Sequence, residues 1–194
     1  MLPYIPPSAY GAPDRIKTLA HGLNVQPLAD ALAAHPEVWD RDTARTASAD
    51  SAHHGLSDVW CRFAPPGGSG RAEHLSVWYP SADLLPVRMM ARELMAVFGA
   101  EQLGGVLITR IPPGAACRPH VDPGWHAGFY DKFAVQVAAA PGQAFHFEGE
   151  AVVTAPGDLY WFRNDALHWV TNDSDQERIT AIFCLRIDRT GSAS

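Results

Sequence analysis

Residues 178–187 read RITAIFCLRI and form a ten-residue run of strong strand tendency in a chain of 194 residues. Branched and aromatic side chains dominate this run, as is typical of β-strands. Residues two apart on a strand project to the same face. Arg178 and Thr180 are therefore expected on one face of this strand, together with Ile182 and Cys184.

Shorter runs of strand composition precede this one, separated by residues that favour turns. Pro156-Gly157 fits the central positions of a type II turn, and Gly149 is suited to a hairpin. Short antiparallel strands at such close spacing are typical of a sandwich or barrel of the jelly-roll kind. We therefore predict a mainly β fold with a jelly-roll core. The strand candidates are 103–111 (LGGVLITRI), 132–137 (KFAVQV), 145–148 (FHFE), 151–154 (AVVT), 158–162 (DLYWF) and 167–170 (LHWV).

The amino-terminal half carries helical patterns. Residues 28–35 lie between prolines and predict a short helix, and apolar residues recur at helical spacing through 84–98. Residues 58–63 alternate like a strand, and 41–54 and 65–71 are expected to be mobile loops. We predict one domain, residues 1–194. In it, 1–102 is a helical and loop part that packs on a jelly-roll catalytic core at 103–188, and 189–194 is a flexible tail.

Composition narrows the classes of function. The chain is 47% hydrophobic and 19% charged, with a formal net charge of −6 and no cluster of Lys and Arg. These values favour a soluble globular protein with neither a nucleic acid nor a membrane as partner. The start MLPYIPPSAYGAP lacks the charged segment of a signal peptide. Three separated cysteines, Cys61, Cys117 and Cys184, indicate reduced thiols, so we predict a cytoplasmic location.

His120-Val121-Asp122 and the distant His168 are the candidate metal ligands. Pro119 and Pro123 bracket the tripeptide and favour extended backbone, which directs His120 and Asp122 to the same side. Two imidazoles and one carboxylate form a facial triad that leaves coordination positions open, which suits Fe(II) and dioxygen. The alternative is a solvated turn with an exposed His and Asp.

These residues, with Lys132, the Pro-Gly-Asp turn and an arginine ten positions after His168, resemble the Fe(II)/2-oxoglutarate-dependent dioxygenases. The resemblance covers residues 103–188 and is strongest to the aspartyl/asparaginyl β-hydroxylase-like branch, whose fold is a double-stranded β-helix. The animal peptidyl-aspartate hydroxylases of that branch lack the carboxylate ligand. Because Asp122 is present, the chain looks more like the bacterial and phage-type members, and the peptidyl-aspartate substrate does not carry over.

The resemblance implies a set of roles. His120, Asp122 and His168 would be the catalytic metal ligands for Fe(II), and O2 would react there with 2-oxoglutarate as co-substrate. Arg178 would pair with the distal carboxylate of 2-oxoglutarate through its planar guanidinium. Thr180 is a candidate for an added hydroxyl contact, and Lys132 for a basic contact near the co-substrate. The alternative for Arg178 is a surface ion pair with Glu177 or Asp175.

The expected activity is hydroxylation of an amino acid, a peptidyl side chain or a small polar metabolite, with release of succinate and CO2. Candidates for substrate contacts come from three places in the sequence: the strand at 58–63, the loop after the first ligands, and the turn before His168. Two alternatives stay open, namely a cupin-type enzyme independent of 2-oxoglutarate and a non-catalytic binding module. The substrate candidates are Trp60, Arg62, Trp125, His126, Arg163 and Asn164.

Overall fold

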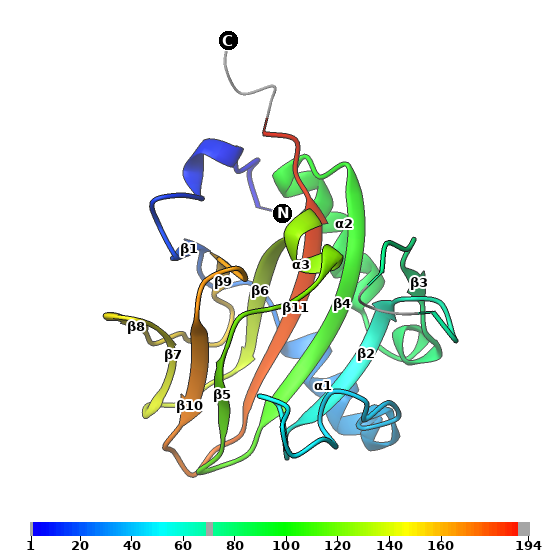
Figure 1. Cartoon of the computed structure of the whole chain (residues 1–194), viewed down its shortest axis with the longest axis vertical. Coiled ribbons are helices and arrows are strands. Elements are labelled where there is room, and N and C mark those ends of the chain that lie inside the picture. The colour runs from blue at the N-terminus through cyan, green and yellow to red at the C-terminus, as the bar shows by residue number, and fades with distance from the viewer. Residues whose placement is uncertain (1, 69–71, 190–194) are drawn as a thin grey trace.

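The computed structural model describes residues 2–68 and 72–189, and within these ranges the strands form two antiparallel sheets. Figure 1 shows the small sheet lying against one side of the large one. This arrangement confirms the prediction of a mainly β jelly-roll core. The large sheet has the order β1 (Ile16–Ala20), β9 (Leu159–Phe162), β6 (Asp131–Ala138), β11 (Arg178–Arg186), β4 (Gln102–Ile111), β2 (Ser57–Phe63), β3 (Val77–Trp78). The small sheet has the order β5 (Ala116–His120), β10 (His168–Asn172), β7 (Gln143–Phe147), β8 (Glu150–Val152).

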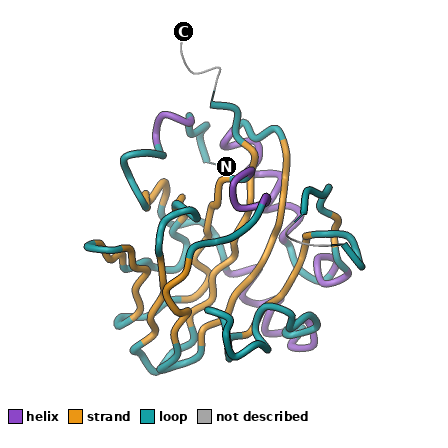
Figure 2. Tube along the Cα trace, in the orientation of Figure 1, coloured by secondary structure: helices purple, strands orange, loops and turns teal. Residues whose placement is uncertain are grey.

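The helices lie on the outside of the molecule, as Figure 2 shows. Helix α2 (Val87–Phe98) ends at Gly99, whose φ of 59° is the left-handed conformation that glycine adopts readily. The five-residue helix α3 (Trp125–Phe129) lies where the sequence predicted a loop. The other helical segments are α1 (Gln26–Ala34) and the 3₁₀ turns Pro7–Ala9, Pro36–Val38 and Pro80–Asp83.

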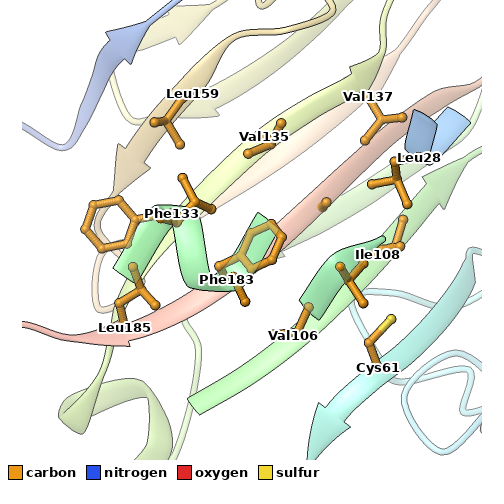
Figure 3. Close-up of a cluster of buried hydrophobic side chains, with 14 of the residues drawn as sticks. Leu28, Cys61, Val106, Ile108, Phe133, Val135, Val137, Leu159, Phe183 and Leu185 are labelled. Carbon is orange, nitrogen blue, oxygen red and sulfur yellow. The ribbon is translucent and has the colours of Figure 1, made fainter. Parts of the chain in front are cut away.

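The main hydrophobic core fills the space between the large sheet and helices α1 and α2. Leu28 of α1 and the strand residues Val106, Phe133 and Phe183 are nearly or fully inaccessible to solvent (Figure 3). In β11 the alternation puts Ala181, Phe183 and Leu185 on this helix-covered side. The opposite face of the large sheet is therefore left to contact the small sheet.

The register of the strands brings distant residues together. In the small sheet His168 lies opposite His120 on β5 and opposite Phe147 on β7. In the large sheet Thr180 of β11 pairs with Thr109 of β4 and with Gln136 of β6. The two sheets thus carry the candidate site residues on the faces that they turn toward each other.

The amino-terminal part supplies strands as well as helices. Strand β2 corresponds to the run predicted at 58–63, whereas β1 and β3 were not anticipated. The β1 sequence IKTLA is short, and it is held as a strand by pairing with β9. Residues 190–194 of the expected tail and 69–71 of the expected 65–71 loop lie outside the described residues. No helix in the described ranges is long and apolar enough to cross a membrane.

Candidate metal centre and its two cavities

The three candidate ligands converge at one end of the space between the sheets. Nε2 of His120 lies 3.8 Å from one oxygen of Asp122, and Nε2 of His168 lies 3.7 Å from the other. One donor atom from each residue lies within 4.8 Å of the other two. Ligand atoms about 2.1 Å from a shared ion are roughly 3 Å apart at right angles, so small movements would close this set around a metal.

Each of the two histidines is oriented by the backbone carbonyl of the residue two positions before it. Nδ1 of His120 is 2.8 Å from the carbonyl of Arg118, and Nδ1 of His168 is 2.8 Å from that of Ala166. A carbonyl only accepts hydrogen bonds, so each Nδ1 carries the proton and each Nε2 presents a lone pair. Burial lowers the pKa of both rings, that of His168 to about 4, which keeps them neutral at neutral pH.

Asp122 is held as a carboxylate. Its backbone N–H donates to the carbonyl of Asn164 at 2.9 Å, and Nζ of Lys132 donates to its side chain at 2.5 Å. Burial by itself raises the pKa of Asp122. The charge and hydrogen bond of Lys132, aided by His168 and His120, outweigh burial and hold the pKa at about 2. Lys132 thus acts on a proposed ligand, and no direct contact with a co-substrate is needed to explain its position.

Arg178 is deeply buried and lines an inner cavity that the three ligands also line. The residue is 1% exposed, and among the described residues no carboxylate lies within ion-pairing distance of it. It donates to the hydroxyls of Thr154 at 3.0 Å and Tyr160 at 3.4 Å, while its Nε has no partner. The neighbouring Glu177 pairs with Arg110 instead, so a surface ion pair does not account for Arg178.

This inner cavity is walled by strands of both sheets. Thr180 faces it beside Arg178 and donates to the side chain of Gln136 at 3.3 Å. The ring of Phe145 stacks on His168 with centroids 5.7 Å apart. Tyr160 was missed in the sequence, although the alternation of 158–162 places it on the same face as Phe162. Further lining residues are Arg45, His53, Thr109, Ile111, Cys117, Lys132, Val170 and Ile182.

A second, outer cleft adjoins the inner cavity at His120, Asp122 and Lys132. Trp60 and His126, two of the substrate candidates, line it. Nε2 of His126 accepts a hydrogen bond from the backbone of Gly105 at 3.0 Å, which leaves the proton on Nδ1. Burial lowers the pKa of His126 to about 4, so the ring is neutral. Phe63, Leu107, Ile182 and Cys184 supply apolar wall, and polar side chains of the 41–54 segment, among them Arg45 and Asp50, line it as well.

The structure does not bring the other four substrate candidates into either of these cavities. An irregularity in the pairing of β2 with β4 separates Trp60 from Arg62, whose guanidinium instead lies over Trp78. Trp125 stacks on Phe129. Strand alternation alone had placed Trp60 and Arg62 on one face, and the bulge breaks that alternation.

The last two of these candidates lie in the turn before β10. Arg163 forms an exposed ion pair with Asp165. The side-chain amide of Asn164 donates to the backbone carbonyls of Ala127 and Tyr130. The backbone carbonyl of Asn164 accepts the hydrogen bond from the backbone N–H of Asp122. Asn164 therefore supports a candidate ligand and does not face the cleft.

The segment expected as a mobile loop at 41–54 forms one wall of the outer cleft. The backbone N–H of Arg118 donates to the carbonyl of Ala52 at 2.8 Å, and its guanidinium donates to the carbonyls of Ala49 and Ser51. Arg45 in this segment forms a bidentate salt bridge with the buried Asp58. No periodic pattern in the sequence predicts these contacts, because turns make them.

Comparisons with known proteins identify the fold. No protein-family model and no curated protein matches the sequence. Solved structures do match, among them an oxidoreductase of the 2OG-Fe(II) oxygenase family from Burkholderia pseudomallei, with 15% identity, 90% of this chain and 88% of that chain covered, and a TM-score of 0.61.

Two hydroxylases match over similar lengths. A prolyl hydroxylase from Trichoplax adhaerens, in complex with a hypoxia inducible factor peptide fragment, has 12% identity, coverage of 90% and 84%, and a TM-score of 0.58. A viral collagen prolyl hydroxylase from Paramecium Bursaria Chlorella virus-1, in complex with 2OG, has 13% identity, coverage of 91% and 98%, and a TM-score of 0.53. The chain shares the fold of these oxygenases.

Proposed function

We propose that this protein is an Fe(II)- and 2-oxoglutarate-dependent oxygenase that hydroxylates its substrate and releases succinate and CO2. The observation that carries the proposal is Arg178, a buried guanidinium without a carboxylate partner in the described chain, which lines the same cavity as His120, Asp122 and His168. A buried unpaired cation is costly, and an anionic ligand would compensate it.

The donor set fits Fe(II). Two neutral imidazole nitrogens and an ionised carboxylate oxygen lie within 4.8 Å of one another, and both cavities meet at His120 and Asp122. Bound iron would supply the activation of O2 that the protein's own side chains cannot provide. The match of fold to a hydroxylase solved with 2OG supports the same co-substrate here.

The remaining roles, namely binding of the co-substrate, control of ligand ionisation and exclusion of water, belong to residues of this chain. Arg178, with the hydroxyls of Tyr160 and Thr180 beside it, would bind the distal carboxylate of 2-oxoglutarate. Lys132 would keep Asp122 ionised as a ligand. The aromatic rings of Phe145 and Phe162 would exclude water from the inner cavity.

The outer cleft would receive the substrate. We propose an amino acid, a peptidyl side chain or a small polar metabolite, positioned against Trp60 and by the Nδ1–H of His126. The peptide complex of the Trichoplax hydroxylase shows that a protein of this fold accepts a peptide, which supports the peptidyl alternative. The full triad, with Asp122 present, supports a place near the bacterial and phage-type members of the aspartyl/asparaginyl β-hydroxylase-like branch.

The test is binding of 2-oxoglutarate to anaerobic protein loaded with Fe(II), measured by equilibrium dialysis. Truncating one partner of a buried hydrogen-bonded charge pair costs about 2–5 kcal/mol, so Arg178→Ala is expected to weaken binding by roughly 30-fold or more. Arg110→Ala is the matched control, because Arg110 lies on the neighbouring strand and pairs with Glu177. It is expected to bind like wild type.

Equal affinities in wild type and Arg178→Ala would contradict the role of Arg178. Wild type that holds iron but does not bind 2-oxoglutarate would favour the cupin-type alternative. A substrate screen that reads succinate formation across amino acids and short peptides would then name the substrate class.

A further inference from the structure

A second cluster of metal-binding side chains lies next to the proposed iron ligands. His53, Cys117 and His120 each offer one donor atom, and these atoms lie within 4.8 Å of one another. Sγ of Cys117 is 3.1 Å from Nδ1 of His53 and 3.8 Å from Nδ1 of His120. His53 comes from the 41–54 segment, whereas Cys117 and His120 come from strand β5.

The spacing matches a tetrahedral site for a soft divalent ion. With metal–sulfur and metal–nitrogen bonds of about 2.3 and 2.05 Å, a sulfur and a nitrogen on one tetrahedral ion lie about 3.5 Å apart. The two observed separations fall on either side of this value. All three residues line the inner cavity, so an ion can reach them without unfolding of the wall.

The surroundings of the thiol are close to electrically balanced. Four charged groups act on Cys117, namely Arg45, Lys132, Asp58 and Asp122. Arg45 is paired with Asp58, and Lys132 with Asp122. Each of the two cations that act on Cys117 is therefore paired with a carboxylate, and Cys117 and His53 have no role in the proposed oxygenase chemistry.

We propose that His53, Cys117 and His120 form a binding site for a thiophilic divalent cation such as Zn²⁺ or Cd²⁺, and that this site competes with the iron triad for His120. On binding, the Cys117 thiol gives up its proton to solvent. Nδ1 of His120 leaves the carbonyl of Arg118, and its proton is replaced by one on Nε2, so the imidazole stays neutral and Nδ1 offers the lone pair. A neutral imidazole has one lone pair, so His120 serves one ion at a time. The competition, but not the site itself, rests on the proposed function.

The test uses Cd²⁺ alone, added to the metal-free full-length chain, and follows the ultraviolet absorption of a cadmium–thiolate bond. Wild type is expected to develop this absorption and to saturate at a single equivalent. Cys117→Ser should lose it, and His53→Ala should weaken Cd²⁺ binding by about tenfold or more. Cys184→Ser is the control, because Cys184 is also buried but belongs to neither ligand group found in the described residues.

The two proposals fail separately. Asp122→Ala should lose Fe(II) yet keep the cadmium–thiolate absorption, since Asp122 is not a ligand of the second site. In wild type, Zn²⁺ should lower the Fe(II) retained after dialysis, and in Cys117→Ser it should lower it much less. The site is refuted if wild type shows no cadmium–thiolate absorption, or if Cys117→Ser keeps it while Cys184→Ser loses it. Fe(II) retention that Zn²⁺ does not change refutes the competition.

Discussion

The inner cavity and the outer cleft meet at His120 and Asp122 but are built largely from different parts of the chain. Strands of both sheets wall most of the inner cavity, including Arg178 and Thr180 of β11 and Tyr160 of β9. The outer cleft has strand residues on one side and the turns of the 41–54 segment on the other. Alternation along strands therefore determines which side chains line most of the inner cavity, whereas individual hydrogen bonds of the 41–54 segment determine the shape of one wall of the outer cleft.

The largest effect is expected at the proposed metal ligands, where the inner cavity meets the outer cleft. Asp122→Ala and His168→Ala each remove one of three ligands, and we expect either variant to lose the Fe(II) that wild type holds after anaerobic reconstitution. Metal analysis after gel filtration measures this. His146→Ala is the control, since His146 lies on the neighbouring strand β7 and stacks on Trp169 away from the ligands. Iron retained in both ligand variants would show that the centre lies elsewhere.

A second change separates the function of the inner cavity from its stability. Arg178→Met replaces a buried cation with an apolar side chain of similar length, and removal of such a charge is expected to stabilise the fold by about 1–3 kcal/mol. The partners stay bonded, because Thr154 also donates to Gln136 and Tyr160 also bonds to Thr180. We expect a higher midpoint in denaturant together with loss of 2-oxoglutarate binding. A lower midpoint would mean that Arg178 holds the fold together.

The strand-built half of the site could be predicted from the sequence because it depends on periodicity. Residues 178–187 placed Arg178 and Thr180 on one face, and the structure has them there, lining the inner cavity. The loop-built half could not be predicted in the same way. His53 and Arg45 reach the site through turns and long-range contacts, and the bulge that turns Arg62 away from Trp60 has no signature in the local pattern.

An effect of intermediate size is expected in the pH dependence of stability, through the ionisation of Asp122. Its pKa in the folded protein is about 2, below the ordinary value of 3.8, so the metal-free protein gains stability from its ionised form. That gain, about 2 kcal/mol, is fully present above pH 4 and is lost as the pH falls toward 2. In Lys132→Met, burial is no longer opposed by the ammonium, and this acid-dependent loss should shrink or change sign.

Denaturant unfolding of the metal-free protein between pH 2 and 5 measures the difference between wild type and Lys132→Met. Lys132→Arg keeps the positive charge and is expected to follow wild type more closely. An unchanged pH dependence in Lys132→Met would show that Lys132 does not set the ionisation of Asp122.

The smallest expected effect belongs to the outer cleft alone. Arg118→Gln removes the guanidinium that bonds the carbonyls of Ala49 and Ser51, while the backbone bond from residue 118 to Ala52 stays. Because the side chain is exposed, we expect a loss of only about 0.5–1 kcal/mol of local stability, seen as roughly two- to fivefold faster hydrogen exchange across the 41–54 segment. Arg163→Gln, which removes an exposed ion pair with Asp165, controls for the loss of a surface arginine.

Since strands and not this segment wall most of the inner cavity, 2-oxoglutarate binding should be the same in both variants. A parallel loss of 2-oxoglutarate binding in Arg118→Gln would mean that the two cavities are coupled through β5, and that the strand-built half of the site depends on the turns after all.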